Sequence, residues 1–146
     1  MNEALAVERL QRMLDEHEFT SAYGFRVVSV GGGEATVVAP FLKRWERPGG
    51  IVSGQVYMNA ADCAMWLAIL GQDLAENGGG PDGRTGMAVS TELNTAFIAP
   101  AREEDITCTA RILRNGRRLV YGVADCRGAD GRILSHHMVT YARTGA

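Results

Sequence analysis

The sequence predicts a single α+β domain in which a curved antiparallel sheet of five or six strands wraps around one long central helix. A second helix is expected on the surface near the N-terminus. Two observations carry this prediction: an almost continuously apolar stretch runs from Gly54 to Gly71, and six shorter segments rich in β-branched residues stand before and after it. Because a helix that is apolar on nearly every side must be surrounded, the strands are expected to enclose it.

Length and composition limit the possible classes of protein. A chain of 146 residues fits one ordinary domain, residues 1–146. Its 46% hydrophobic and 22% charged residues and its net charge of −2 argue against a disordered chain and a broadly basic nucleic-acid binder. Charged residues interrupt the first 19 positions, so we expect no secretory signal and a cytoplasmic protein. Gln55, Asn59 and Asp62 within the apolar stretch argue against a membrane span.

The N-terminal third predicts a helix, a hairpin and a loop. Residues 3–16 place apolar side chains mostly three or four positions apart, which is typical of a surface helix with one apolar stripe. Residues 24–30 and 34–39 are separated by three glycines and predict a β-hairpin. The segment 44–50 contains Pro48 and two glycines, so it predicts an ordered loop that cannot continue a strand.

The long helix is predicted to begin at Gly54, with Ser53 as its N-cap, and to end in the mid-70s at the glycine-rich connection 77–83. Four strand-like segments follow, at 86–98, 105–114, 118–127 and 132–142. The dipeptides Asn115-Gly116 and Asp130-Gly131 are strong tight-turn signals. They predict that the last three segments form an antiparallel meander.

Asp62 is the candidate reactive residue, because it is the only formally charged residue between Arg47 and Asp73. A carboxylate in apolar surroundings is costly to keep ionised. We therefore expect Asp62 to act as a general base or nucleophile. The alternative is a structural carboxylate that accepts hydrogen bonds from loop amides near residues 47–53. Asn59, three residues earlier on the same helix face, could be its partner.

The cysteines and histidines predict no metal site. Cys63, Cys108 and Cys126 are too far apart for a zinc motif, so they are expected to be reduced thiols. Cys63 fits a small buried hydrophobe better than a nucleophile. His136 and His137 are adjacent in a strand-like segment and should point to opposite faces of the sheet.

The run RPGGIVSGQVYMNAADCAMWLA at 47–68 resembles the hotdog-fold thioesterases, specifically the acyl-CoA thioesterases of the phenylacetate-pathway type. The run STELNTAFIAPA at 90–101 is similar to a strand of the same family. In that family the loop and helix have the pattern N-x-x-G-x-x-H-G-G, with an acidic residue further along the helix. Gly50 and Gly54 match two of the glycines, and Asp62 falls on the acidic position.

The chain also departs from this pattern: Arg47 stands at the family's asparagine, Ser53 at its histidine and Gln55 at its second glycine. The resemblance implies a hotdog fold, thioester hydrolysis and a homodimer, with frequent homotetramers. It implies no cofactor, because coenzyme A would enter as part of the substrate.

Helix geometry adds the second half of a site. The backbone N–H groups of Gly54 and Gln55 are first-turn donors at the positive end of the helix dipole, which suits a developing oxyanion. Gly54 and Asp62 are eight residues apart, hence about 12 Å along one helix, so one thioester cannot readily touch both. A two-fold dimer with antiparallel long helices would bring Asp62 of one subunit to Gly54 of the other.

Further candidates each have a plain alternative. Ser90 lies where the resemblance implies a hydroxyl that helps to place the water, but an ordinary strand hydroxyl is equally compatible. Ser53 borders the proposed substrate site, yet helix capping explains it. Asn59 could also face the substrate. Met58 could line an acyl tunnel or belong to the core.

Arginines could bind the substrate. Arg47, close to the proposed carbonyl site, could stabilise negative charge, bind a carboxylated acyl group or neutralise Asp62. Arg117 and Arg118, beside the Asn115-Gly116 turn, could hold the phosphates of coenzyme A or form a solvated face.

Together these patterns predict hydrolysis of an acyl-CoA or similar thioester to a free acid and a thiol. The first alternative is a non-catalytic protein of the same fold that binds acyl-CoA or another small ligand, favoured by Arg47 and Ser53. A hydratase or dehydratase is disfavoured, because no histidine lies between His17 and His136.

Overall fold

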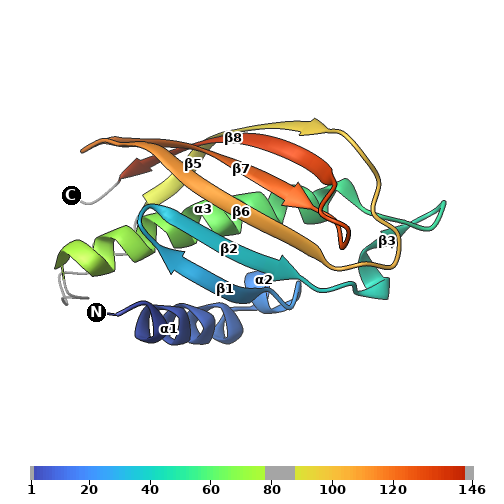
Figure 1. The fold of residues 1–146 in the computed structure, drawn as a ribbon, viewed down its shortest axis with the longest axis horizontal. Helices are drawn as coiled ribbons and strands as arrows, with labels where there is room; N and C mark the ends of the chain where they lie inside the picture. Colours follow the sequence, from blue (N-terminus) through green and yellow to red (C-terminus); the bar gives the residue numbers. More distant parts are fainter. Residues whose placement is uncertain (1, 78–87, 144–146) are drawn as a thin grey trace.

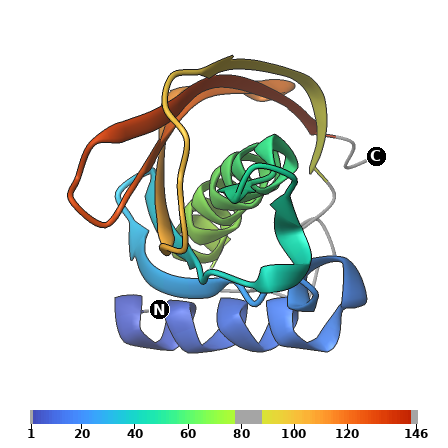
Figure 2. The same ribbon diagram turned by 90° about the vertical axis from the view of Figure 1, so that its right-hand side faces the viewer.

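The computed structural model describes residues 2–77 and 88–143 and has the predicted architecture (Figure 1). The central helix, α3, spans Gly54–Asn77. In the view turned by 90°, the curved sheet encloses α3, and helix α1 lies outside the sheet (Figure 2). The prediction of an α+β fold with a helix wrapped by an antiparallel sheet is confirmed, and the sheet has six strands.

The sheet combines a hairpin, a meander and one strand added at the edge. Its strands are β1 (Arg26–Gly31), β2 (Glu34–Ala39), β5 (Ala88–Phe97), β6 (Ile106–Asn115), β7 (Leu119–Arg127) and β8 (Ile133–Arg143). The spatial order is β1-β2-β6-β7-β8-β5, and all neighbours are antiparallel. The β1–β2 hairpin and the β6–β7–β8 meander confirm the predictions. The predicted connection at 77–83, apart from Asn77, and the first two residues of the strand predicted at 86–98 lie outside the described residues.

Helix α3 is enclosed because its side chains are mostly apolar. Six of them have 0% exposure: Ala60, Ala61, Ala64, Met65, Leu67 and Ile69. A stripe with three- and four-residue spacing stays partly accessible and consists of Gln55, Asn59, Asp62 and Trp66. The helix therefore has one face that the described residues cover only in part, and Asp62 lies on it.

Two glycines allow α3 and the sheet to approach closely. A Cβ atom on Gly71 of α3 would lie 2.1 Å from Cγ1 of Val30 in β1. A Cβ atom on Gly122 of β7 would lie 2.4 Å from Cε of Met65. At Gly122 the same Cβ atom would also lie 2.5 Å from the main-chain oxygen of Arg111, which cannot move aside as a methionine methyl can. Glycine at both positions lets the neighbouring side chain fill the space.

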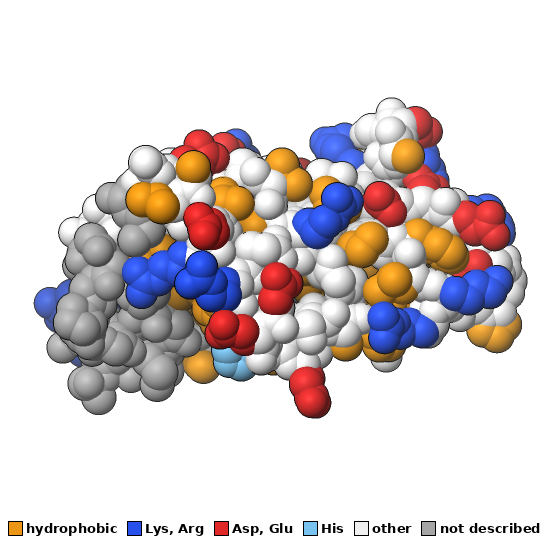
Figure 3. All heavy atoms as spheres, turned by 90° about the horizontal axis from the view of Figure 1, so that it is seen from below, with side chains coloured by type: hydrophobic (Ala, Val, Ile, Leu, Met, Phe, Trp, Pro, Cys, Tyr) orange, Lys and Arg blue, Asp and Glu red, His pale blue; other side chains and the backbone are white. Residues whose placement is uncertain are grey.

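The N-terminal helix α1 (Glu3–Glu16) is present as predicted. Its N-cap is Asn2, whose side chain accepts a hydrogen bond from the N–H of Leu5 at 2.9 Å. The buried stripe of α1 consists of Ala6, Leu10 and Leu14, while acidic and basic side chains mix over the face of the molecule seen in Figure 3. A one-turn helix, α2 (Glu18–Ser21), follows and was not predicted.

The segment predicted as a loop at 44–50 is more regular than expected. A 3-10 turn at Lys43–Trp45 leads into a two-stranded ribbon of β3 (Glu46–Arg47) and β4 (Ile51–Val52). The prediction that a strand cannot continue through this segment holds only at its centre. Pro48 and the two glycines form the turn, where Gly49 and Gly50 have φ of 104° and 72°. Among the helices of the described residues, none combines the length and apolar character needed to cross a bilayer.

Candidate active site

Asp62 borders a pocket of about 260 Å³ between α3 and the start of β5. We call it the acid pocket; its polar lining includes Asn59, Asp62, Ser90 and Tyr141. The Tyr141 hydroxyl, on β8, donates a hydrogen bond to Oδ1 of Asp62 at 2.6 Å and lies 3.0 Å from the Asp62 main-chain oxygen. Among the described residues the carboxylate is thus held by a phenol from the sheet, not by the amides of loop 47–53.

Tyr141 remains a hydrogen-bond donor because its surroundings disfavour the phenolate. Burial, and then the negative charge of Asp62, raise the pKa of the Tyr141 hydroxyl above its ordinary value, while a hydrogen bond with the Ser90 side chain opposes that shift. Ser90 faces Tyr141 across the β5–β8 ladder, next to an irregularity between Ser90 and Glu92. The structure therefore brings two predicted site residues, Ser90 and Asp62, into the lining of one pocket together with Tyr141.

Asn59 lines the acid pocket, and among the described residues its side chain pairs with Tyr23 and not with Asp62, the partner that the sequence suggested as possible. Its Nδ2 donates to the Tyr23 hydroxyl at 2.6 Å. The Tyr23 ring stacks on Phe25 and on Trp45, with centroid distances of 5.2 and 4.6 Å. The partner of the Asn59 amide is therefore a tyrosine that belongs to this aromatic stack.

The thiol beside Asp62 is not a nucleophile. Cys63 is 6% exposed, and burial raises its pKa to about 12, so the thiolate is scarce at neutral pH. All three cysteines are free and buried. His136 and His137 point to opposite faces as predicted: His137 is fully buried beside Thr95 and Ser135, whereas His136 is partly exposed and pairs with Asp125 at 2.6 Å.

A second pocket, of about 420 Å³, lies where α3 begins. We call it the amide pocket; Arg47, Gly54, Tyr57, Phe97, Ile98 and Pro100 are among its lining residues. Ser53 caps α3 as predicted, because its Oγ accepts a hydrogen bond from the N–H of Gln55 at 3.3 Å.

Gly54 and Gln55 differ as potential donors. The Ser53 hydroxyl occupies the N–H of Gln55, whereas the described residues supply no acceptor for the N–H of Gly54. A Cβ atom on Gly54 would lie 2.9 Å from Cε1 of Phe97. A side chain at position 54 would therefore crowd the space between the helix terminus and the Phe97 ring.

The remaining candidates lie apart from Asp62. Arg47 is exposed at the amide pocket, its Nε donates to the Pro48 oxygen at 3.2 Å, and within the described chain it forms no ion pair with Asp62. Met58 is half-buried and lines neither pocket. Arg117 and Arg118 are exposed between β6 and β7 and also line neither pocket.

Sequence reasoning missed Tyr141, although a signal existed. Alternation along the segment 132–142 places Tyr141 on the same face as Val139, which has 0% exposure. An inward tyrosine needs a partner for its hydroxyl, and the isolated Asp62 was an available acceptor. The pairing depends on a contact between residues 79 positions apart, which local patterns do not supply.

Comparisons with known proteins identify the fold and the family. A candidate esterase of Saccharolobus solfataricus is 28% identical over 127 residues, covering 87% of this chain and 77% of that protein. Among solved structures, the PaaI protein of the E. coli phenylacetic acid degradation operon matches with a TM-score of 0.81 and 18% identity, covering 97% of this chain and 94% of that one. A mutant thioesterase from Pseudomonas aeruginosa matches with a TM-score of 0.78 and 20% identity, covering 93% and 91%.

At these identities the solved structures establish the fold, which is the hotdog fold. A model of the thioesterase superfamily matches residues 49–134, more than half of the chain, and this stretch contains both ends of the candidate site, Gly54 and Asp62. The chain therefore belongs to the thioesterase superfamily.

Proposed function

We propose that the protein hydrolyses an acyl-CoA, or a similar thioester, to a free acid and a thiol. Membership of the thioesterase superfamily supports thioester hydrolysis in general terms. The observation that carries the finer proposal is the Asp62 carboxylate, which Tyr141 holds at the wall of an accessible pocket. Coenzyme A enters as part of the substrate.

Asp62 acts as general base or as nucleophile. As a base it takes a proton from a water molecule whose oxygen attacks the carbonyl carbon, and the Ser90 hydroxyl helps to place that water. The carbonyl oxygen becomes an oxyanion, which the N–H of Gly54 stabilises at the positive end of the helix, with the N–H of Gln55 as a second donor once Ser53 releases it. The carbon–sulfur bond then breaks, and the leaving thiolate takes up a proton.

A dimer is needed because the two groups lie in different pockets. Asp62 is in the acid pocket and Gly54 in the amide pocket, about 12 Å apart along α3 at 1.5 Å per residue. Both pockets border β5: Ser90 lines the first and Phe97 the second. Strand β5 forms an edge of the sheet, and most of its residues are exposed. An edge strand presents unpaired backbone groups that can pair with another strand.

We therefore propose that two copies pair antiparallel along β5, about a two-fold axis near Leu93 and Asn94. Ser90 of one subunit then faces Phe97 of the other, and each site receives Asp62 from one chain and Gly54 from its mate. The same pairing covers the accessible stripe of α3. Association of two such dimers into a homotetramer remains a prediction.

The arginines would bind the substrate's charged parts. In this dimer Arg47 comes with Gly54 to the mate's Asp62, where it would stabilise negative charge or bind a carboxylated acyl group. Asn59 and Met58 on α3 would contact the acyl chain. Arg117 and Arg118 would bind phosphates of coenzyme A.

The proposal is tested with a panel of short, long and aromatic acyl-CoAs, in which the released thiol is measured for wild type and Asp62→Asn. Asp15→Asn is the matched control, because Asp15 is exposed on α1 and lies outside both pockets. We expect turnover of at least one thioester class, a fall in kcat of about 100-fold or more for Asp62→Asn, and no change for the control.

Two outcomes would contradict the proposal. Acyl-CoA binding without turnover by wild type would instead support a non-catalytic binding protein. Turnover that Asp62→Asn leaves unchanged would remove Asp62 from the reaction.

A further inference from the structure

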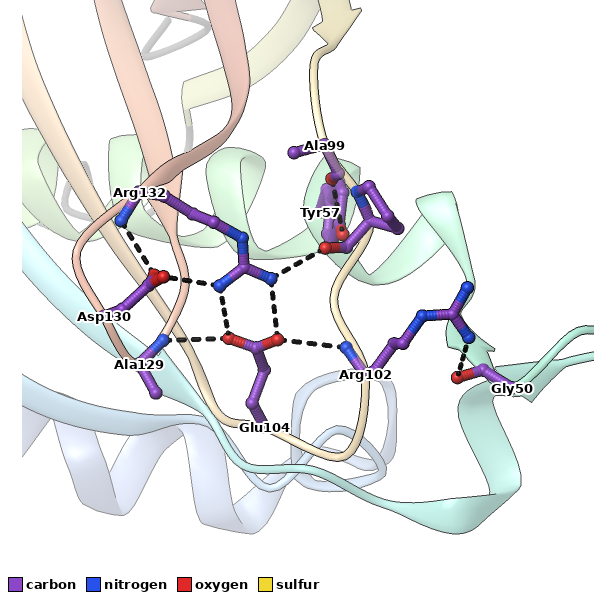
Figure 4. Close-up of polar contacts among 9 residues, drawn as sticks. Gly50, Tyr57, Ala99, Arg102, Glu104, Ala129, Asp130 and Arg132 are labelled. Carbon is purple, nitrogen blue, oxygen red and sulfur yellow. Dashed lines mark hydrogen bonds and ion pairs between the residues drawn. The ribbon is translucent and has the colours of Figure 1, made fainter.

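A group of charged residues surrounds the segment next to the amide pocket (Figure 4). The guanidinium of Arg132 donates to Glu104 through both terminal nitrogens, Nη1 to Oε1 at 3.1 Å and Nη2 to Oε2 at 2.8 Å. It also donates to Asp130 Oδ1 at 2.8 Å and to the main-chain oxygen of Pro100 at 2.9 Å. We call the residues Glu104 and Arg132 the brace.

The Glu104 carboxylate is well satisfied in this position. Besides Arg132, it accepts hydrogen bonds from the N–H of Arg102 and the N–H of Ala129, each at 3.0 Å. These contacts, led by the Arg132 hydrogen bond, lower the pKa of Glu104 to about 2. The Glu104 side chain is only 14% exposed, and its fork-to-fork geometry distinguishes the pair from an ordinary surface ion pair.

The backbone beside the brace is strained. Glu103 has φ of +43°, the one positive value for a non-glycine residue in the described chain. A side chain makes this conformation unfavourable, and it persists where the surroundings enforce it. Here both neighbours are held, Arg102 through its N–H to Glu104 and Glu104 through Arg132.

The braced segment connects to the start of α3 through successive contacts. The Tyr57 hydroxyl donates to the Ala99 oxygen at 3.2 Å, and the N–H of Val52 donates to the Ala101 oxygen at 2.9 Å. The Arg102 side chain donates to the main-chain oxygen of Gly49 at 2.8 Å. It also donates to that of Gly50 at 3.4 Å, the contact drawn in Figure 4. Val52 is two residues before Gly54, so the position of the helix terminus depends on this segment.

We propose that Glu104 and Arg132 are positioning residues, which fix residues 99–102 and thereby hold the Gly54 N–H and the wall of the amide pocket in place for the reaction. Neither residue lines the pocket, so each acts through the backbone. The proposal rests on the proposed function, in which the Gly54 N–H stabilises the oxyanion. A misplaced donor weakens transition-state binding more than substrate binding, because the charge appears only in the transition state.

Glu104→Gln is the main variant, because a glutamine of the same shape places an NH2 group against converging N–H donors. Arg132→Lys is a milder second variant that keeps the charge and loses the fork. Glu8→Gln is the matched control, because Glu8 belongs to an exposed ion pair with Arg12 on α1. For the two brace variants we expect kcat to fall about tenfold or more while KM changes less than about twofold, and for the control neither to change.

Amide hydrogen exchange at residues 52–55 gives a second readout that needs no turnover. We expect faster exchange there in Glu104→Gln than in wild type or Glu8→Gln. Unchanged exchange at residues 52–55 in Glu104→Gln would overturn the positioning role of the brace. An unchanged kcat in folded Glu104→Gln, or a rise in its KM alone, would also overturn it. A wild type that hydrolyses no thioester would refute the proposed function instead, and the exchange result would still decide the brace.

Discussion

The acid pocket and the amide pocket lie at two ends of the same strand but are built in opposite ways. The acid pocket presents side chains from separate elements, with Asp62 on α3 and Tyr141 on β8 joined by one hydrogen bond. The amide pocket is built from backbone groups, at Gly54 where α3 begins and at loop segments whose main-chain oxygens accept hydrogen bonds from Arg102 and Arg132. One chain therefore presents a carboxylate at one place and a helix-terminal N–H at another, and the proposed chemistry needs both together.

Combining one defective chain of each pocket in the same dimer should give the largest effect on activity. Asp62→Ala removes the acid, and Gly54→Val fills the space beside Phe97 in front of the amide, so each variant alone is expected to lose about 100-fold or more in kcat. Co-expressed chains form heterodimers with one intact site. With random pairing, half of the dimers are mixed and half of their sites are intact, so activity should return to about a quarter of wild type. Dimers of mixed chains that stay inactive would contradict the composite site.

Tyr141→Phe tests the hydrogen bond that holds the carboxylate of the acid pocket. Losing the 2.6 Å hydrogen bond leaves Asp62 less well oriented, and we expect kcat to fall about tenfold with little change in KM. Tyr121→Phe is the matched control, because Tyr121 is a partly exposed tyrosine whose hydroxyl contacts the Met138 sulfur. Equal activities for the two variants would show that the phenol has no part in the reaction.

Ser90→Ala should have a smaller effect. The Ser90 hydroxyl is exposed on β5 and lines the acid pocket with Tyr141, so its loss should lower kcat about threefold if it helps to place the water. Wild-type kinetics in this variant would assign Ser90 to the strand alone.

The smallest expected effect is on the pH dependence of stability, through Glu104 beside the amide pocket. The pKa of Glu104 is lowered from 4.5 to about 2 by the Arg132 hydrogen bonds, so the folded state holds its protons less tightly than the unfolded chain. The resulting stabilisation is complete above about pH 4.5 and is lost as the pH falls toward 2. Melting temperatures of wild type and Glu104→Gln should therefore differ by a few degrees at pH 6 and converge near pH 2. A constant difference across this range would be contrary to the expected linkage.

Much of the fold could be predicted because its signals are local. The apolar periodicity of α3, the three glycines after Val30 and the Asn115-Gly116 turn each specify structure over a few residues. Strand β5 could be recognised but not placed, since it follows α3 in sequence and yet pairs with β8. The short β3–β4 ribbon was missed because Pro48 and its glycines predicted a loop, while two residues on each side still pair.

The candidate site was only half visible in the sequence. Asp62 was identified because its charge is isolated among apolar neighbours, and Gly54 because a helix had to begin there. Tyr141 and the Arg132–Glu104 pair depend on where separate strands and turns meet, and Glu104 lies 28 residues from Arg132. Helical spacing made Asp62 a possible partner of Asn59, but it does not reveal that Tyr23 approaches from another segment and accepts from the Asn59 amide.

The two glycines where α3 meets the sheet have a consequence for the rotation of that helix. A Val30 methyl fills the space beside Gly71 of the helix, and the Met65 methyl fills the space beside Gly122 of the sheet. Both contacts depend on the position of α3 along its axis and on its rotation about that axis. Rotating α3 by the equivalent of one residue would move Asp62 by about 100° around the helix axis. The direction in which the carboxylate points therefore depends on two glycines, which carry no functional group.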